Sequence, residues 1–316
     1  MTMPTSRQSV FRSLIVLLTS MASAASLADS KNGFELDHAL VPAEEILHGG
    51  PARDGIRSLD YPAFVAADDA GFLKSRDRVL GIELNGVARA YPIRILNYHE
   101  IVNDAFGGHA VVVTYCPLCI SGIAFDAKIG GTRLEFGVSG LLYNSDVLLY
   151  DRQTGSLWSQ IEKTAITGSM KGTRLNSFPM THTTWRDWVA RYPDTEVLSD
   201  QTGFRVDYKT DPYLEYSRAG KLMFPVSEEN SKYRRKSLVL GLEIDGQFKA
   251  YPFSELNKSP KVFVDEFQGR EFEVRYDKRN KTASISDENG RELPSLISYW
   301  FAWFAFHPET EVYEAG

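Results

Sequence analysis

Val79-Leu80-Gly81-Ile82-Glu83-Leu84-Asn85-Gly86 is the stretch that decides the expected fold, because the chain repeats it. The second copy reads Val239-Leu240-Gly241-Leu242-Glu243-Ile244-Asp245-Gly246. Each copy continues into the same tripeptide, Ala90-Tyr91-Pro92 in the first and Ala250-Tyr251-Pro252 in the second. Internal similarity of this kind indicates a duplicated structural unit, so we interpret the chain as two copies of one fold.

Both copies begin with a predicted β-hairpin. Asn85-Gly86 and Asp245-Gly246 each follow a run in which apolar residues predominate and precede a second strand-like run. A type I′ turn needs positive φ at both central residues, and Asn-Gly and Asp-Gly adopt it readily. These dipeptides therefore predict the turns of two equivalent hairpins.

The similarity continues to the end of each copy. With one residue inserted, Asp104, Phe106, Gly108 and Tyr115 match Asp265, Phe267, Gly269 and Tyr276, and Trp185, Trp188, Pro193, Thr195, Glu196 and Val197 match Trp300, Trp303, Pro308, Thr310, Glu311 and Val312. Tryptophans three positions apart are typical of a short helix laid on a sheet, with the indoles in the core. The predicted class is α+β, predominantly antiparallel β: an internally duplicated β-rich unit, each copy ending in a short Trp-bearing helix.

The two copies differ where chemistry is expected. Cys116 corresponds to Asp277, and with nearly the same offset His99 and Glu100 fall on Ser259 and Pro260. The second copy therefore keeps the scaffold and lacks the reactive side chains.

The first copy also carries an extra segment. Tyr115 and Trp185 lie 70 positions apart, whereas the equivalent Tyr276 and Trp300 lie 24 apart, a difference of 46 residues. Its pattern predicts hairpins rather than helices. The predicted strands are 125–128 paired with 132–138 across Gly130-Gly131, and 147–150 paired with 156–160.

The N-terminus has the pattern of a secretory signal peptide. Arg7 and Arg12 precede the apolar run 14–18, which is followed by small residues up to Ala28. This run is too short for the roughly 20 residues of a membrane-spanning helix, and no later stretch is long enough. We expect a periplasmic or secreted protein with no integral membrane segment after cleavage; the alternative is an uncleaved N-terminal anchor.

The organisation predicted from these patterns has five parts. They are a signal peptide at 1–28, an N-terminal extension at 29–58, a first repeat at 59–200, a connector at 201–220 and a second, degenerate repeat at 221–316. The net charge is -6 with acids and bases interspersed, so no basic stripe for nucleic acid is expected. The expected partner is a small molecule or a metal ion, and the sequence does not identify a protein partner.

The only cysteines are Cys116 and Cys119, separated by two residues. A lone pair so close together cannot staple a fold, and its spacing indicates redox chemistry, metal ligation or both. The run 111–115 predicts a buried strand, which Pro117 ends in a turn. The residues at 120–129 favour β-structure, which argues against a thioredoxin-like arrangement with a helix after the cysteines.

Three interpretations of the cysteine pair remain open. The first is a disulfide within the turn. The second is a copper or zinc site, in which Cys116 and Cys119 bind the metal with His99, and Glu100 orients His99. The third is a nucleophilic or persulfide-forming cysteine. Weaker candidates for the remaining metal ligands are Met170, Met180 and His182.

Polar residues of the extra segment are further candidates. We predict Cys116, Cys119, Asp146 and Arg152 as catalytic residues. In this interpretation Asp146, or Asp151 with Arg152, lines a pocket beside the sulfurs with Trp158 as its wall. The alternative for Asp151 and Arg152 is a hairpin turn with a surface ion pair.

Several motifs occur together in one order. They are HEIVND at 99–104, TYCPLC at 114–119, SGLLYNSD at 139–146 and YDRQTGSLWSQ at 150–160. In these motifs the chain resembles the DUF3179-type family of bacterial proteins of unknown function. The resemblance covers most of the chain after the signal peptide and implies no settled activity. The family often has Gly after the second Cys, where this chain has Ile120.

The function predicted from the sequence is a periplasmic thiol- or metal-dependent redox enzyme that uses Cys116 and Cys119, with an unknown substrate. Two alternatives stay open. One is a non-catalytic copper- or zinc-binding protein, and the other is a ligand-binding module with an inert disulfide.

Overall fold

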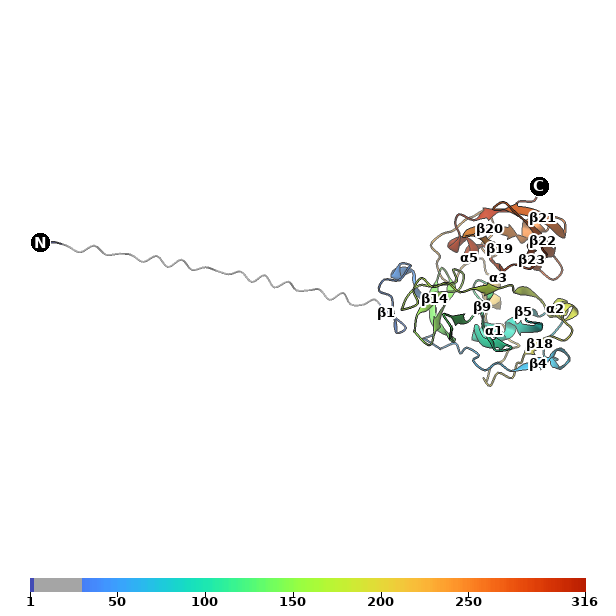
Figure 1. The fold of residues 1–316 in the computed structure, drawn as a ribbon, viewed down its shortest axis with the longest axis horizontal. Helices are drawn as coiled ribbons and strands as arrows, with labels where there is room; N and C mark the ends of the chain where they lie inside the picture. The colour runs from blue at the N-terminus through green and yellow to red at the C-terminus, as the bar shows by residue number, and fades with distance from the viewer. Residues whose placement is uncertain (3–29) are drawn as a thin grey trace.

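The computed structural model describes residues 1–2 and 30–316, so nearly all of the predicted signal peptide at 1–28 lies outside the described residues. The described chain is mostly antiparallel β-sheet (Figure 1). Five sheets of three to five strands are arranged as blades of a propeller-like ring. The predicted α+β class therefore fits only loosely, since the helices are short.

The duplicated hairpin forms the centre of one sheet in each copy. In the first copy β5 (Arg78–Leu84) and β6 (Val87–Pro92) lie between β17 (Thr181–Thr184) and β18 (Glu196–Leu198), with β4 (Phe64–Ala66) outermost. In the second copy β19 (Leu238–Ile244) and β20 (Gln247–Pro252) lie between β24 (Ser295–Tyr299) and β25 (Glu311–Val312). Both hairpins have two-residue turns at positive φ, as predicted for Asn85-Gly86 and Asp245-Gly246.

The Trp-bearing helices are present in both copies. They are α2 (Trp185–Arg191) and α5 (Trp300–Phe306). Trp188 lies so close to Gly81 that a Cβ there would approach the indole to 2.3 Å, and Gly241 meets Trp303 at 2.0 Å. Glycine is therefore required in both strands because the helix packs directly on the sheet.

Each copy has a second sheet, whose strands follow the duplicated hairpin in the sequence. It contains β7 (Ile101–Phe106), β8 (His109–Cys116), β9 (Ser121–Asp126) and β16 (Ser177–Phe178) in the first copy, and β21 (Val262–Phe267), β22 (Arg270–Asp277) and β23 (Thr282–Ser286) in the second. Strand β9 packs beside β24, and β23 packs beside β17. The two copies thus contact each other crosswise, each through its second sheet.

The extra segment of the first copy builds a sheet of its own. Its strands are β12 (Phe136–Tyr143), β13 (Asp146–Asp151), β14 (Leu157–Ser159) and β15 (Thr164–Ala165), joined by β3 (Leu47–His48) of the N-terminal extension. The predicted pairing of 147–150 with 156–160 is observed as β13 against β14. The glycine hairpin is smaller than predicted, comprising only β10 (Lys128–Ile129) and β11 (Thr132–Arg133).

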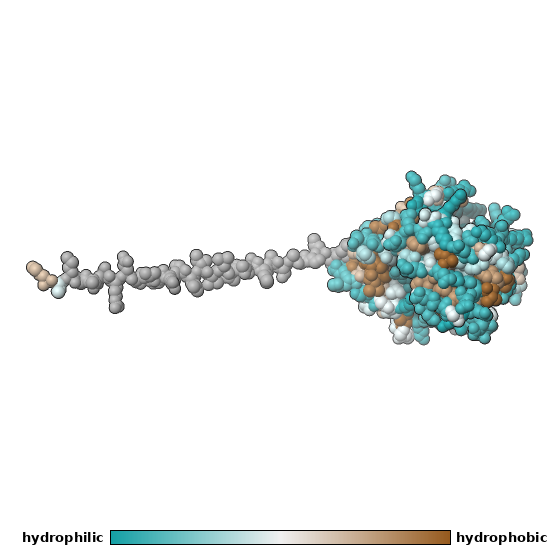
Figure 2. Space-filling model, turned by 90° about the horizontal axis from the view of Figure 1, so that it is seen from above, coloured by the Kyte–Doolittle hydropathy of each residue, from teal (hydrophilic) through white to brown (hydrophobic). Residues whose placement is uncertain are grey.

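The remaining elements are short. They are β1 (Ser30–Lys31), β2 (Phe34–Glu35), η1 (Ala43–Glu45), η2 (Ala67–Asp69), α1 (Ile93–His99), α3 (Leu214–Arg218) and α4 (Phe253–Leu256). None of the described helices has the length and apolar character needed to cross a membrane. Figure 2 shows a mostly hydrophilic surface with separate hydrophobic patches, and the largest aromatic side chains are buried.

Candidate metal centre

The cysteines lie on the turn between β8 and β9. Cys116 ends β8 and pairs with Ser121, the first residue of β9. Between them, Ile120 has a φ of 54°, a conformation that is strained for a β-branched residue and natural for glycine. The turn is anchored from outside, because Tyr216 Oη donates to Leu118 O at 3.1 Å and Tyr299 N donates to Cys119 O at 3.0 Å.

Three potential metal ligands converge at this turn. The Sγ atoms of Cys116 and Cys119 and a carboxylate oxygen of Asp146 all lie within 4.8 Å of one another, and all three residues are buried. Asp146 is the first residue of β13, so the extra sheet supplies the third group. Of the predicted catalytic residues, the structure brings these three together.

A strained hairpin turn positions Asp146 over the sulfurs. Asn144 and Ser145, which connect β12 to β13, have φ values of 50° and 63°. The Ser145 carbonyl faces both thiols, at 3.3 Å from Cys119 Sγ and 3.8 Å from Cys116 Sγ. Asparagine adopts positive φ readily, so the strain falls mainly on Ser145, where it costs about 1–3 kcal/mol and is enforced by surrounding contacts.

The second repeat supplies those contacts. Asn144 Oδ1 accepts hydrogen bonds from Ser227 N at 2.8 Å and Ser227 Oγ at 2.9 Å, and Asn144 Nδ2 donates to Ala305 O at 3.3 Å. Ser145 Oγ donates to Phe224 O at 3.0 Å. The degenerate copy therefore holds the turn that delivers Asp146.

A chain of buried polar groups leads from Thr114 to Asp146. Gln160 Nε2 lies 2.8 Å from Thr114 Oγ1, whose own proton goes to Ile123 O at 2.9 Å, so the Gln160 Oε1 faces Ser121. Ser121 Oγ is 2.7 Å from Gln160 Oε1 and 3.1 Å from Asp146 Oδ1, and it has one proton to donate. That proton is directed at Gln160 Oε1 and at the Asp146 carboxyl group, and the Ile161 amide donates to Asp146 Oδ2 at 3.3 Å.

The pKa values favour an uncharged site. Burial raises the pKa of both thiols above the ordinary range. Burial likewise raises the pKa of Asp146 to about 7, and burial together with Asp146 raises the pKa of Glu100 to about 8. Acidic groups held neutral by desolvation can release their protons when a cation binds among them.

A small cavity adjoins the site. It has a volume of about 80 Å³ and is lined by Cys116, Glu100 and mainly apolar side chains, among them Leu118, Val138, Leu142, Val147, Tyr213 and Phe224. Met223, which is 56 % exposed, lies at its rim. Cys116 and Cys119 are only 1 % and 0 % exposed, and of the two only Cys116 lines the cavity.

His99 is not placed as a metal ligand. Its Nδ1 lies 2.6 Å from Arg57 O and its Nε2 lies 2.5 Å from Tyr208 Oη, so both ring nitrogens are already engaged. Helix α1 ends at His99, and Glu100 turns the chain with a φ of 57°. Glu100 therefore faces the cavity, whereas the predicted orienting contact between Glu100 and His99 is absent from the described hydrogen bonds.

Arg152 and Asp151 contact residues other than the cysteines. Arg152 forms an ion pair with Asp60 at 3.0 Å and donates to Ser58 Oγ at 2.8 Å. Asp151 accepts from Thr154 N at 2.6 Å and from Trp158 Nε1 at 2.9 Å. Only Asp146 of this segment's charged residues joins the cysteines, and Trp158 is a core residue.

Two of the weaker ligand candidates, His182 and Met180, lie in other parts of the fold. His182 is buried on β17, and Met180 lines a different cleft, beside Gly122 and His307. Met170 is a partly buried side chain packed against the hydrophobic cluster that also contains both cysteines. Among the described residues no histidine joins the group formed by the two sulfurs and Asp146.

Both cysteines are free thiols in the structure, so it does not contain the disulfide that one interpretation required. Two features were not predicted from the sequence. One is the chain of buried polar groups through Thr114, Gln160 and Ser121, and the other is the position of Glu100 at the cavity. Ser121 and Gln160 carry a weak signal, since polar residues stand there amid strand-forming ones.

Comparison with known proteins gives one match. No curated protein and no solved structure matches the chain. A family model described as "Protein of unknown function (DUF3179)" matches residues 53–310, a range that runs from before the first copy to beyond the last helix. The chain therefore belongs to the DUF3179 family.

Proposed function

We propose that Cys116, Cys119 and Asp146 hold a copper or zinc ion, and that the exported protein is a metal-dependent enzyme acting on a small, largely apolar molecule. Copper would supply redox chemistry, whereas zinc has none of its own and would act as a Lewis acid. The observation that carries the proposal is the convergence of two thiols and a carboxyl group within 4.8 Å beside a cavity. Two sulfurs and one oxygen suit thiophilic or borderline metals rather than calcium or magnesium.

The donor set leaves room for a further ligand. Three protein ligands with an open fourth position are typical of catalytic zinc, whereas structural zinc sites are closed by four protein ligands. Cys116 borders the cavity, so a ligand in the cavity lies next to the metal position. The mainly apolar lining favours a small apolar substrate, and Glu100 is the polar group available to orient it.

The burial of the sulfurs favours a metal over exchange with protein thiols. Disulfide exchange needs an accessible thiolate, whereas burial raises the pKa of both thiols here and leaves them at most 1 % exposed. Metal binding removes the thiol protons itself and compensates the resulting negative charge.

Metal content measured together with free thiols tests the proposal. The protein, purified from a host grown with zinc and copper, is expected to contain close to one equivalent of one of them. Cys116→Ser, Cys119→Ser and Asp146→Asn are expected to lower that content. Asp151→Asn is the matched control, because Asp151 is a buried carboxylate on the same strand that does not contact the sulfurs.

The outcomes separate the candidate functions. A metal-free protein with a quantitative disulfide would contradict the metal centre and favour thiol redox chemistry. Metal that passes rapidly to a chelator would indicate a delivery or storage protein. Metal retained against the chelator and accessible to small exogenous ligands, detected by spectroscopy after cobalt substitution, would support an enzyme.

A further inference from the structure

The second copy has its own version of the cysteine turn. Asp277 pairs with Thr282 as Cys116 pairs with Ser121, so Asn280 occupies the position equivalent to Cys119. Asn280 Nδ2 donates to Asp277 Oδ2 at 2.7 Å, which closes the turn by a hydrogen bond instead of a sulfur pair.

This second turn contacts the first copy. Thr184 Oγ1, at the start of α2, donates to Asn280 Oδ1 at 2.8 Å. The equivalent contact on the other side joins Tyr299, at the start of α5, to Cys119 O. The molecule therefore has two related junctions between its copies, and only one of them contains thiols.

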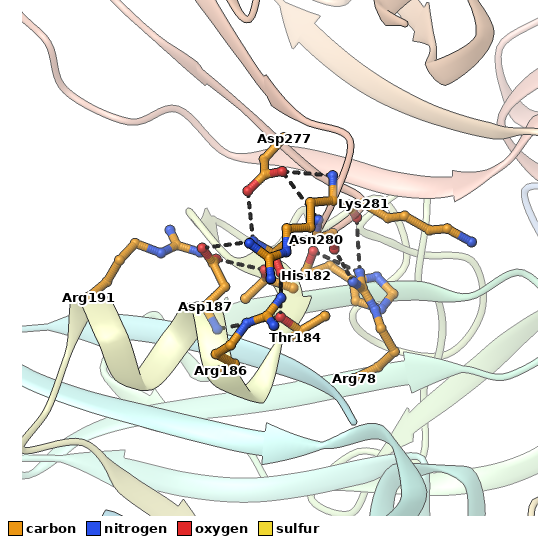
Figure 3. Close-up of polar contacts among 11 residues, drawn as sticks. Arg78, His182, Thr184, Arg186, Asp187, Arg191, Asp277, Asn280 and Lys281 are labelled. Carbon is orange, nitrogen blue, oxygen red and sulfur yellow. Dashed lines mark hydrogen bonds and ion pairs between the residues drawn. The ribbon is translucent and has the colours of Figure 1, made fainter. Parts of the chain in front are cut away.

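The second junction contains a cleft of about 450 Å³ with a strongly positive lining. Five of its seven lining residues are cationic: Arg76, Arg78, Arg186, Arg279 and Lys281, together with Thr184 and Asn280. Figure 3 shows Arg78 and Arg186 from the first copy beside Asn280 and Lys281 from the second. The whole chain has a net charge of -6, so this gathering of cations runs against its overall charge.

Most of these charges lack an acidic partner. In the part of the chain that the structure describes, the charged ends of Arg76, Arg279 and Lys281 have no hydrogen bond or ion pair, and all three residues are exposed. Arg186 only reaches Asn280 Oδ1, at 3.3 Å.

The nearby carboxylates are already engaged. Asp187 forms an ion pair with Arg191 on the same helix and accepts from Thr183 Oγ1 at 2.7 Å. Asp277 accepts from Asn280 and from the amide of Arg279 at 2.8 Å. Asp277 keeps its negative charge, since its donors are neutral, and neither carboxylate forms an ion pair with the five cations that line the cleft, so the described charges there remain positive in sum.

Arg78 forms the fixed wall of the cleft. Its guanidinium donates to three carbonyl groups, of His182 at 2.9 Å, Asn280 at 2.5 Å and Lys281 at 3.1 Å. Burial lowers its pKa to about 10, which leaves it charged at neutral pH. These bonds explain how Arg78 joins the copies, but they do not explain why four further cations surround it.

We propose that this cleft binds a small anion bearing a phosphate or a dicarboxylate group. Guanidinium groups bind such oxygens with two parallel hydrogen bonds, and a positively lined cleft concentrates anions. Unpaired like charges repel one another, so an anion bound among them is stabilised by several contacts at once. The site is independent of the metal centre, since it shares no residue with it.

Titration calorimetry with inorganic phosphate and with succinate, at ionic strength held constant with chloride, tests the proposal. At least one of the two is expected to bind the wild-type protein. Arg76→Gln and Arg279→Gln are each expected to weaken that binding about tenfold, because each removes a charge-assisted contact. Neither side chain has a described partner, so folding should be unaffected.

Arg133→Gln is the matched control, since Arg133 is an exposed arginine on β11, outside the cleft. Its affinity should stay within about twofold of wild type. The proposal is overturned if neither anion binds, or if the cleft variants and Arg133→Gln weaken binding equally. Metal content should be unchanged in all three variants, which separates this result from the fate of the metal centre.

Discussion

At the scale of single residues, burial without an opposite charge is the main influence on the chemistry of this protein. Burial raises the pKa of Asp146, Glu100 and both thiols and so shifts all four groups toward their neutral forms. A cation bound there would reverse that preference, because it supplies the missing opposite charge. Burial lowers the pKa of a histidine instead, because the charged form of a histidine is the protonated one.

His307 is expected to make the fold sensitive to acid. It is stacked on Phe248 with ring centroids 3.7 Å apart, and burial with nearby Lys163 and Arg174 lowers its pKa from 6.5 to about 3. Because the folded protein binds the proton more weakly, the contribution of His307 is complete above pH 6.5. It is lost as the pH falls toward 3, by about 1.4 kcal/mol per pH unit.

The substitution His307→Phe keeps a stacked ring and removes the titration. Urea unfolding measured from pH 7 to pH 4 should therefore show a shallower loss of stability in the variant. Buried His182, whose pKa is also lowered by burial, remains in both proteins and sets a common background. Parallel stability curves for the two proteins would disprove the role of His307.

At the scale of elements, two hairpin turns of the first copy together form the candidate site, and one of them belongs to the extra sheet. The turn from β12 to β13 delivers Asp146, and the turn from β8 to β9 delivers the cysteines. Neither turn is held only by its own sheet, because Ser227, Ala305, Tyr216 and Tyr299 bind them from the connector and the second copy.

The substitution Asn144→Gly tests that support. Glycine adopts the positive φ of this position without strain, so the turn should persist while the amide contacts with Ser227 and Ala305 are lost. We expect metal to leave the variant several-fold faster in a chelator competition assay, with the fold retained.

The matched control is Asn85→Gly, at the equivalent turn position of an exposed hairpin with a φ of 56°. It makes the same chemical change without touching the candidate site. Equal release rates from Asn144→Gly and wild type would show that the contacts of Asn144 do not hold Asp146 in place.

At the scale of the whole molecule, the two copies form crosswise junctions of different chemistry. One places thiols and a carboxyl group beside an apolar cavity, and the other gathers cations around an exposed cleft. Duplication supplied two similar turns, and their residues have since diverged. The degenerate copy has a clear structural role, since it contacts both turns of the candidate site.

The location of the protein is a prediction about the whole chain. Expression of the full-length gene in a Gram-negative host should yield a periplasmic protein whose N-terminal sequence begins close to Asp29, as the signal-peptide pattern predicts. Cell fractionation with N-terminal sequencing measures this directly. Recovery of intact chain in the membrane fraction would instead indicate the uncleaved anchor.

The sequence by itself determined the features that depend on neighbouring residues. Asn85-Gly86 and Asp245-Gly246 fold as predicted hairpin turns, and the paired tryptophans lie on short helices in the core. Turn conformation and helical period are local properties, so spacing and residue type predict them. The repeat also revealed the duplicated architecture, because equal patterns fold into equal units.

Only the tertiary structure decided which side chains meet. Asp146 joins the cysteines, whereas His99 binds Tyr208 and Arg152 binds Asp60, although all three were plausible partners in the sequence. The choice depends on how β13 lies over the turn from β8 to β9, and on contacts made by residues more than seventy positions further along the chain. Such distant packing is set by the burial of whole sheets against one another, which local spacing does not encode.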